Sequence, residues 1–281
     1  MTGEAAAHEA VPAGQDLPEA ARRLKAAAVS LPPEPPAEAR VLHSGPAEGA
    51  WNMALDEALA EESAATGVCH VRFYGWLQPT LSLGYFQTFE SRRQHQPSQS
   101  CAVVRRASGG GAILHHRELT YSIAMPAQHP LARPAKALYL AVHHSLLEAL
   151  EQAGILAELH SDAAKGSAGE PFLCFERRAA GDVVLEGRKI AGSAQRRLRG
   201  AILQHGSILL AASPFAPELP GVQEIRGLSV SPADLASLWQ PILIRQLGLR
   251  VVAGDCPGDL VSAAKRLSAA KFGPERWTRL R

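Results

Sequence analysis

Apolar residues recur every three or four positions in four separate segments of the chain. The first segment predicts a helix over roughly 51–65. A second helix is expected over 134–152, which starts at a proline and is followed by Gly154. Residues 233–247 and 257–271 show the same spacing. Helices are therefore expected both in the middle of the chain and toward its end.

Shorter apolar runs, bounded by glycine and proline, predict strands. These runs cover 68–74, 80–85, 101–106 and 118–125. Residues 182–210 predict a three-strand meander, with turns near Glu186-Gly187 and Arg199-Gly200. The mixed order of strands and helices predicts the α+β class, with mixed β-sheets flanked by helices.

The first 40 residues have a different composition. They are rich in Ala, Glu and Pro and end in Leu31-Pro32-Pro33-Glu34-Pro35-Pro36. Such a segment buries little apolar surface, so a disordered tail is expected over 1–40. A single domain is expected over 41–281, with the folded part beginning near Val41.

Composition excludes several classes of partner. The net charge of +2 gives no electrostatic case for nucleic acid. Basic residues outnumber acidic ones seven to three between 176 and 200, which suits an acidic protein partner or an ordinary solvated surface. No apolar run reaches the ~18 residues of a membrane helix, and the N-terminus lacks a signal-peptide pattern. We therefore expect a cytoplasmic protein that does not bind membranes.

A glycine triplet, Gly109–Gly111, follows the expected strand 101–106. The triplet lacks the Lys-Ser/Thr of a phosphate loop, and Ala112–His115 continues as a strand, so no helix N-terminus is available for a phosphate. Of the two preceding arginines, which point to opposite faces, one should lie on the side of the glycine turn. We therefore expect the triplet to hold a ligand by close backbone approach, without a nucleotide cofactor.

Neither the histidines nor the serines predict a site of their own. His115 and His116 point to opposite faces of a strand, so a zinc site built on them is disfavoured and no metal is expected. Ser108 and Ser193 have no base partner that is visible in the sequence, which argues against a serine-triad hydrolase.

Cys174 is the candidate nucleophile among four cysteines that include no Cys-x-x-Cys pair. Cys69 and Cys101 lie in apolar strand patterns typical of buried thiols. Cys174 instead follows a glycine-bearing loop and has cationic neighbours, which favour the reactive thiolate. Lys189, near an expected turn, would be a cation that stabilises this thiolate and polarises a substrate carbonyl.

Four ordered motifs resemble the biotin/lipoate protein ligase superfamily over about 50–210. They are Asn52-Met53-Ala54-Leu55-Asp56, Arg105-Arg106-Ala107-Ser108-Gly109-Gly110-Gly111-Ala112 with His115, Gly187-Arg188-Lys189-Ile190-Ala191-Gly192-Ser193-Ala194-Gln195, and Gln204-His205-Gly206-Ser207. The resemblance implies the catalytic fold of that superfamily and an acyl-binding site.

Within the superfamily, Pro171-Phe172-Leu173-Cys174-Phe175-Glu176 resembles the cysteine-dependent octanoyltransferases. The resemblance implies octanoyl transfer from acyl carrier protein, through a cysteine thioester, to a lysine of a lipoyl carrier domain such as the glycine cleavage H protein. Gly111 departs from those transferases, where a side chain is expected, and keeps an ATP-dependent lipoate ligase open. An amidotransferase between lipoyl carriers and an inactive carrier-binding module are further alternatives.

The resemblance also assigns site residues. Cys174 and Lys189 would be catalytic, and the amides near Gly110 or Gly192 would bind the oxyanion. His205 would be a general base or, with more support, a structural residue, and His115 would line the acyl pocket. The full set expected to bind substrate is Arg106, Ser108, Gly109, Gly110, Gly111, His115, Gly192, Ser193, Gln195 and His205.

Overall fold

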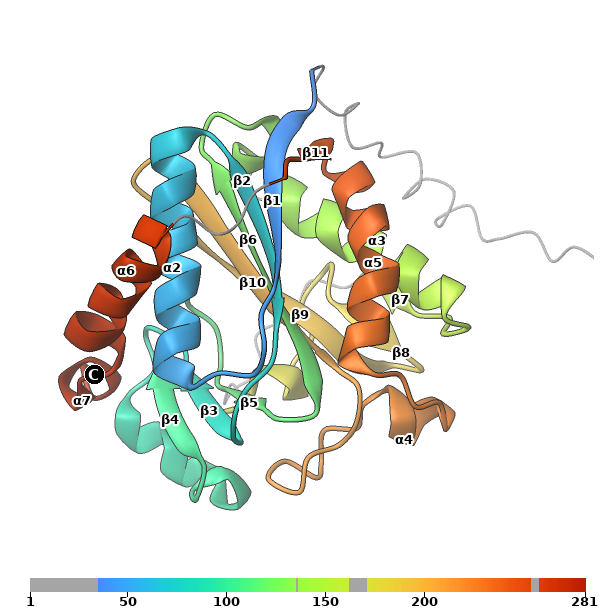
Figure 1. The fold of residues 1–281 in the computed structure, drawn as a ribbon. Coiled ribbons are helices and arrows are strands. Elements are labelled where there is room, and N and C mark those ends of the chain that lie inside the picture. The colour runs from blue at the N-terminus through green and yellow to red at the C-terminus, as the bar shows by residue number, and fades with distance from the viewer. Residues whose placement is uncertain (1–34, 135, 162–170, 254–257) are drawn as a thin grey trace, which may run out of the picture. The chain divides into compact units, whose positions relative to one another are not determined.

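A computed structural model describes residues 35–134, 136–161, 171–253 and 258–281, and these belong to one compact unit. Its centre is an eight-stranded mixed sheet in the order β11-β1-β2-β6-β10-β9-β8-β7 (Figure 1). A smaller sheet has the order β4-β3-β5. The expected α+β class with mixed sheets flanked by helices is confirmed.

The large sheet is parallel at one edge and antiparallel elsewhere. β1 (Ala37–His43) pairs in parallel with β2 (Cys69–Tyr74) and β11 (Leu249–Val251). The other strands are β6 (Glu118–Pro126), β7 (Glu158–Leu159), β8 (Val183–Leu185), β9 (Arg188–Leu198) and β10 (Ala201–Leu209), all of them in antiparallel pairs. The expected meander over 182–210 is thus β8–β9–β10, and its turns use Gly187 and Gly200 at positive φ.

Helices cover both faces of this sheet. Adjacent residues of β6 show it: Ser122 bonds Asp56 of α2 (Gly49–Thr66), while Tyr121 packs on Trp239 of α5 (Pro232–Gln246). α6 (Gly258–Leu267) packs on α2, and α3 (Ala137–Gln152) packs on α5 (Figure 1). Helix α2 is buried almost all round, which explains its mostly apolar sequence.

The small sheet presents the glycine triplet. β3 (Thr80–Leu83) pairs in parallel with β4 (Ala102–Arg105) and antiparallel with β5 (Ile113–His115). The triplet therefore connects two strands that flank β3. The remaining helical elements are short: η1 (Phe89–Gln94), η2 (Gln96–Ser98), η3 (Pro130–Ala132), η4 (Cys174–Glu176), α4 (Val222–Arg226), η5 (Ser268–Phe272) and α7 (Glu275–Thr278).

The boundary expected at Val41 is wrong by several residues. β1 already begins at Ala37 and is held between two strands, so its backbone hydrogen bonds outweigh the Pro-rich composition that precedes it. The rest of the expected tail, residues 1–34, lies outside the described residues.

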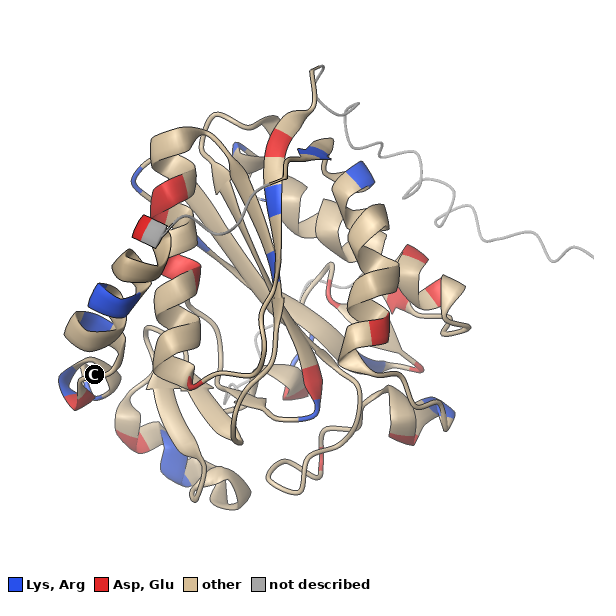
Figure 2. Cartoon of the chain, in the orientation of Figure 1, with Lys and Arg blue, Asp and Glu red and all other residues tan. Residues whose placement is uncertain are grey.

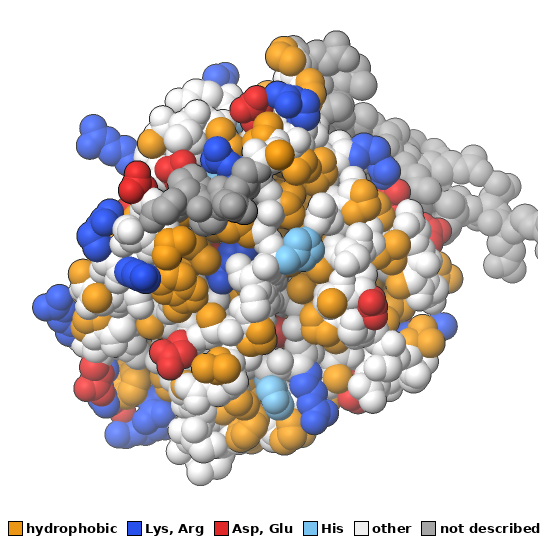
Figure 3. Space-filling view, in the orientation of Figure 1, with side chains coloured by type: hydrophobic (Ala, Val, Ile, Leu, Met, Phe, Trp, Pro, Cys, Tyr) orange, Lys and Arg blue, Asp and Glu red, His pale blue; other side chains and the backbone are white. Residues whose placement is uncertain are grey.

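Charged side chains lie mainly on helices and connecting segments, while the central strands carry few (Figure 2). On the face drawn in Figure 3, hydrophobic, acidic and basic side chains are interspersed. Among the described residues, no helix has the length and apolar character needed to span a bilayer.

Candidate active site

Cys174 begins the short turn η4 and is partly exposed. Its N–H donates to the carbonyl of Ala112 at 2.7 Å, and the Ala112 N–H donates to the carbonyl of Phe172 at 2.9 Å. The segment thus forms a parallel bridge to Ala112, which lies directly after the glycine triplet and just before β5. The thiol is placed beside the backbone that the sequence motif predicted as ligand-binding.

The other described cysteines are buried. Burial raises the pKa of the Cys69 thiol to about 12 and also raises the pKa of Cys101. Both predictions of buried thiols are confirmed, whereas Cys256 lies outside the described residues. Of the cysteines that the structure describes, Cys174 is therefore the one accessible to a substrate.

Lys189 stands next to the cysteine at the start of β9. Its Nζ lies 3.8 Å from Cys174 Sγ and 3.5 Å from the Cys174 carbonyl oxygen. The same ammonium forms an ion pair of 2.8 Å with Asp182, and the two side chains are 4% and 2% exposed. Asp182 also accepts hydrogen bonds from the Tyr139 hydroxyl and the Ala179 N–H, both at 2.7 Å. Sequence reasoning placed the lysine but missed this buried partner, which stands seven residues earlier in the chain.

Gly192 makes room for the lysine. A Cβ on Gly192 would lie 2.6 Å from Lys189 Cε and 2.8 Å from its Nζ, closer than real Cβ contacts. Position 192 must therefore lack a side chain for the Lys189 ammonium to reach Cys174. The substrate-binding role expected for Gly192 stays a prediction.

Arg106 fixes the shape of the glycine triplet. Its Nη2 donates to the carbonyls of Gly109 (2.9 Å) and Gly111 (2.6 Å), and its Nη1 donates to the Ser82 carbonyl (2.9 Å). Burial lowers the pKa of Arg106 to about 10, while interaction with Cys174 opposes that shift. Arg106 is therefore the arginine on the triplet's side, as the alternation predicted. Arg105 instead binds Gly84, Gln87 and the α7 backbone.

Two glycines permit the close contacts around the triplet. A Cβ on Gly84 would lie 1.9 Å from the Gly110 carbonyl oxygen. A Cβ on Gly111 would lie 3.1 Å from the Phe172 carbonyl oxygen and 3.2 Å from Cys174 Cα. The glycine at position 111, which departs from the transferase pattern, is thus explained by the tight approach of the cysteine segment.

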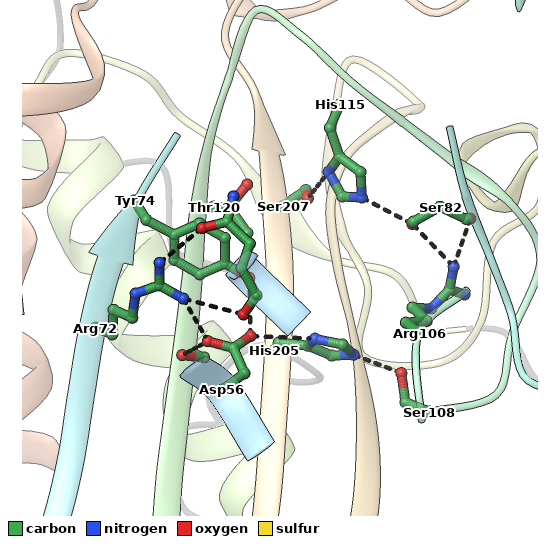
Figure 4. A network of polar contacts seen from close by, with 12 residues as sticks. Asp56, Arg72, Tyr74, Ser82, Arg106, Ser108, His115, Thr120, His205 and Ser207 are labelled. Carbon is green, nitrogen blue, oxygen red and sulfur yellow. Dashed lines mark hydrogen bonds and ion pairs between the residues drawn. The ribbon is translucent and has the colours of Figure 1, made fainter. Parts of the chain in front are cut away.

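Ser108 and His205 belong to a buried polar network (Figure 4). His205 hydrogen-bonds Ser108 through Nε2, and its Nδ1 lies 3.6 Å from Asp56 Oδ2. No base partner of Ser108 is visible in the local sequence, because His205 on β10 and Asp56 on α2 come from distant parts of the chain. Ser108 is 1% exposed, so we assign the network to holding the base of the glycine loop.

Asp56 is the anchor of this network. It accepts hydrogen bonds from Arg72 (2.8 Å), Tyr74 (2.9 Å) and Ser122 (2.7 Å). Burial raises the pKa of the Asp56 carboxyl, but contacts with His205, Arg72 and Ser122 together bring it below its usual value. Burial also lowers the pKa of His205, against the pull of Asp56.

His115 lines a small, largely apolar pocket that is partly open to solvent. Its ring stacks on Trp76 at a centroid distance of 3.9 Å, and it bonds Ser82 (2.8 Å) and Glu118 (2.5 Å). The other lining residues are Met53, Tyr74, Arg106, Ile113, Thr120, Ala194, His205, Gly206 and Ser207. His115 lies at the wall of this pocket together with Arg106 and His205, and its role in binding the acyl chain stays a prediction.

Ser193 and Gln195 take part in a second polar chain. Ser193 hydrogen-bonds Tyr121 and, at 2.5 Å, His143 Nε2. Gln195 donates to Gln204 at 2.7 Å. The sequence shows no base partner for Ser193 either, because that partner is His143 on α3, a helix whose pattern gives no sign of it. Within the described residues, no cluster of three His, Cys, Asp or Glu could hold a metal ion.

Comparison with known proteins finds relatives that match most of the chain. An octanoyltransferase LipM from Geobacillus kaustophilus is 41% identical over 180 residues, which cover 61% of this chain and 65% of that relative. A LipM from Moorella thermoacetica is 36% identical over 251 residues, 85% of this chain and 90% of its own. A structure described as a putative lipoate protein ligase from T. acidophilum matches with a TM-score of 0.71 at 19% identity, covering 87% of this chain and all of that one.

The family described as the lipoyl protein ligase A/B catalytic domain matches residues 48–216. That range contains Cys174, Lys189, the glycine triplet and the pocket wall. The fold agrees as well, since the T. acidophilum structure superimposes over nearly nine-tenths of the chain. This chain therefore belongs to the lipoyl protein ligase A/B catalytic domain family.

Proposed function

We propose that the protein is an acyltransferase that moves an octanoyl group onto a lysine of a lipoyl carrier domain. One observation carries the proposal: the ammonium of Lys189 lies 3.8 Å from the thiol of the accessible cysteine, beside the glycine triplet. The relatives named octanoyltransferases support the acyl group, and a structural neighbour from Thermoplasma acidophilum, a bipartite lipoate protein ligase described with its E2 lipoyl domain, supports the class of acceptor.

The first step is thioester exchange with octanoyl acyl carrier protein. The Cys174 thiolate attacks the thioester carbonyl, and the carrier's thiolate leaves as the octanoyl-enzyme thioester forms. A cation beside the sulfur favours the thiolate before attack. The backbone amides near Gly110 or Gly192 and the Lys189 ammonium would stabilise the oxyanion of the tetrahedral intermediate.

The octanoyl chain would enter at the pocket lined by Trp76, Ile113 and His115, whose walls must move apart to admit it. Ile113 follows Ala112, whose carbonyl accepts the Cys174 N–H, so the pocket wall adjoins the segment that carries the nucleophile. Burial of a chain of eight carbons against apolar walls would favour binding by roughly 0.8 kcal/mol for each CH₂.

The second step is aminolysis. The acceptor's lysine amine attacks the enzyme thioester, the C–S bond breaks, and Cys174 leaves as its thiolate while an amide forms and the proton that the amine loses passes to solvent. The thioester supplies the activation for amide formation, so neither ATP nor a metal enters these steps. The glycine cleavage H protein is the carrier we would try first as acceptor.

Transfer assays test the proposal. With octanoyl acyl carrier protein and H protein but no ATP, the wild type should form octanoyl-H protein. The Cys174→Ala variant should transfer the octanoyl group at least ~10³-fold more slowly. Cys69→Ala, at a buried cysteine far along the sheet, is the matched control and should remain active. Strict dependence on ATP with free octanoate or lipoate would contradict the proposal in favour of a ligase. Transfer from octanoyl-H protein alone would assign an amidotransferase.

A further inference from the structure

The loop that follows β3 exposes an aromatic side chain beside the glycine triplet. Phe86 is 72% exposed, and a Cβ on Gly109 would lie 3.7 Å from its ring. An edge-to-face contact with Tyr85, at a centroid distance of 5.0 Å, supports the ring from one side. A single exposed apolar residue is ordinary on a protein surface, so its surroundings decide whether it marks a binding surface.

Arginines from distant parts of the chain gather on these rings. The Arg281 guanidinium lies 4.9 Å from the Tyr85 centroid and 5.5 Å from the Phe86 centroid. Arg196, on β9, lies 5.3 Å from the Tyr85 centroid. Such contacts hold a guanidinium in place without neutralising its charge.

Phe89 extends this cluster to the end of the chain. Figure 1 shows α7 beside the short helical turns that follow β3, and the Phe89 N–H donates to the backbone oxygen of Arg281 at 2.7 Å. The Phe89 centroid lies 4.7 Å from the Arg92 guanidinium and 4.2 Å from that of Arg279. These side chains form an arginine–aromatic patch that consists of Tyr85, Phe86, Phe89, Arg92, Arg196, Arg279 and Arg281.

The patch carries more positive charge than neighbouring carboxylates balance. Arg279 pairs with Glu275 at 2.5 Å. Within the part of the chain that the structure describes, no carboxylate forms an ion pair with Arg92, Arg196 or Arg281. Arginines that are not balanced in this way attract an acidic partner, speed its encounter with the surface and favour one orientation.

An open groove connects the patch with the cysteine segment. Its walls combine aromatic rings, a side-chain amide and backbone, and include Phe86, Gln87, Gly110, Gly111, Phe172 and Arg177. A Cβ on Gly111 would lie 3.2 Å from Cys174 Cα, so the groove passes beside the residue that carries the thiol. A partner on the patch is thus next to a path toward the nucleophile.

We propose that the arginine–aromatic patch docks the donor acyl carrier protein, an inference that rests on the proposed function. The partner that fits has an acidic surface and a long arm, with a phosphodiester at its root, amides along it and the thioester at its tip. Arginines suit the acidic surface and the phosphodiester, and the groove suits the arm. The acceptor's lysine is short and must meet the Cys174 thioester directly, so the donor is the carrier that can dock to one side.

The acylation half-reaction tests this docking. Thioester formation on Cys174 is followed by intact mass at several concentrations of octanoyl acyl carrier protein. Arg92→Glu with Arg281→Glu replaces attraction by repulsion and should lower kcat/KM by ~10²-fold at low ionic strength. Added salt should slow the wild type and narrow this difference, because it screens the charges. Phe86→Ser should lower kcat/KM by ~10-fold, as for a central interface side chain.

A donor without a protein separates docking from damage to the site. Octanoyl-pantetheine carries the thioester on a similar arm, and it should acylate the wild type and the double arginine variant equally well. Phe86→Ser should slow this small donor too, because the Phe86 ring also lines the groove. Two matched controls should leave acylation by octanoyl acyl carrier protein unchanged: Arg250→Glu, at an exposed arginine on the edge strand β11, and Leu156→Ser, at a side chain that is also 72% exposed.

The outcomes distinguish the docking surface from the function beneath it. Normal acylation by octanoyl acyl carrier protein in the double variant would overturn the docking alone, and so would an equal loss with octanoyl-pantetheine. The isolated acyl-enzyme of the double variant should transfer to H protein at the wild-type rate, and a loss confined to this step would assign the patch to the acceptor instead. A wild type that forms no thioester with either donor would overturn the proposed function and the docking with it.

Discussion

Removing the charge of Lys189 should sharply lower the reactivity of Cys174. An ammonium 3.8 Å from a thiolate contributes about 4 kcal/mol at an effective dielectric constant of ~20. Asp182 opposes this, because it lies 2.8 Å from Nζ and hence no farther than about 6.6 Å from the sulfur. At that separation it repels the thiolate by about 2.5 kcal/mol or more. The pair together therefore favours the thiolate by at most about 2 kcal/mol.

Two variants convert these magnitudes into rates. Lys189→Ala leaves the carboxylate unbalanced and should slow alkylation of Cys174 by iodoacetamide at neutral pH by up to ~10³-fold. Lys189→Ala with Asp182→Asn removes both charges and should slow it by only ~30-fold or less. Lys189→Arg keeps the charge but has a planar, bulkier head, so we expect partial rescue.

The assay is the alkylation rate of the peptide that contains Cys174, measured by mass spectrometry from neutral to alkaline pH. The deficit should close as the pH rises, since every variant then becomes thiolate. Buried Cys69 and Cys101 serve as internal references. Superimposed curves for wild type and Lys189→Ala would refute the electrostatic role, and a double variant slower than the single one would refute the role of Asp182.

Three further predictions concern the fold. Gly84→Ala places a Cβ 1.9 Å from the Gly110 carbonyl oxygen and should lower the free energy of unfolding, measured by urea denaturation, by ~2 kcal/mol or more. The control Gly45→Ala adds a Cβ with nothing within 4 Å and should leave that free energy unchanged. Burial lowers the pKa of His70 from 6.5 to about 4, so as the pH falls the unfolded chain binds the proton before the folded one does. The free energy of unfolding should therefore fall by about 2 kcal/mol between pH 7 and pH 5. His70→Leu should remove this part of the pH dependence. Deleting 1–34 should leave the melting temperature unchanged, while deleting 1–43 removes β1 and should lower it by more than ~5 °C.

Local pattern predicted most of the central elements. The helix over 51–65, the four apolar strands and the meander over 182–210 each came from periodicity or turn residues, and each is present. β1 was missed because the Pro-rich run before it dominates the local composition. β11 and β7 are two or three residues long, and only their partners in the sheet make them strands.

The parts of the candidate site that lie within one sequence motif were predictable, whereas contacts between distant segments were not. Cys174 and Lys189 lie in motifs, which is why the sequence alone makes them candidates. The partners that set their chemistry come from elsewhere: Asp182 and Tyr139 around Lys189, and His143 on α3 around Ser193. A lone His or Tyr on a helix carries no local signal of what it will contact across the fold, so only the tertiary structure reveals these pairings.

The formation of an acyl-enzyme tests the central claim most directly. The protein is mixed with octanoyl acyl carrier protein, without ATP or acceptor, and its intact mass is measured. We predict one added octanoyl mass, located on the peptide that contains Cys174, removed by hydroxylamine and absent in Cys174→Ala. An unmodified wild type, or an equal adduct in Cys174→Ala, would contradict the thioester mechanism.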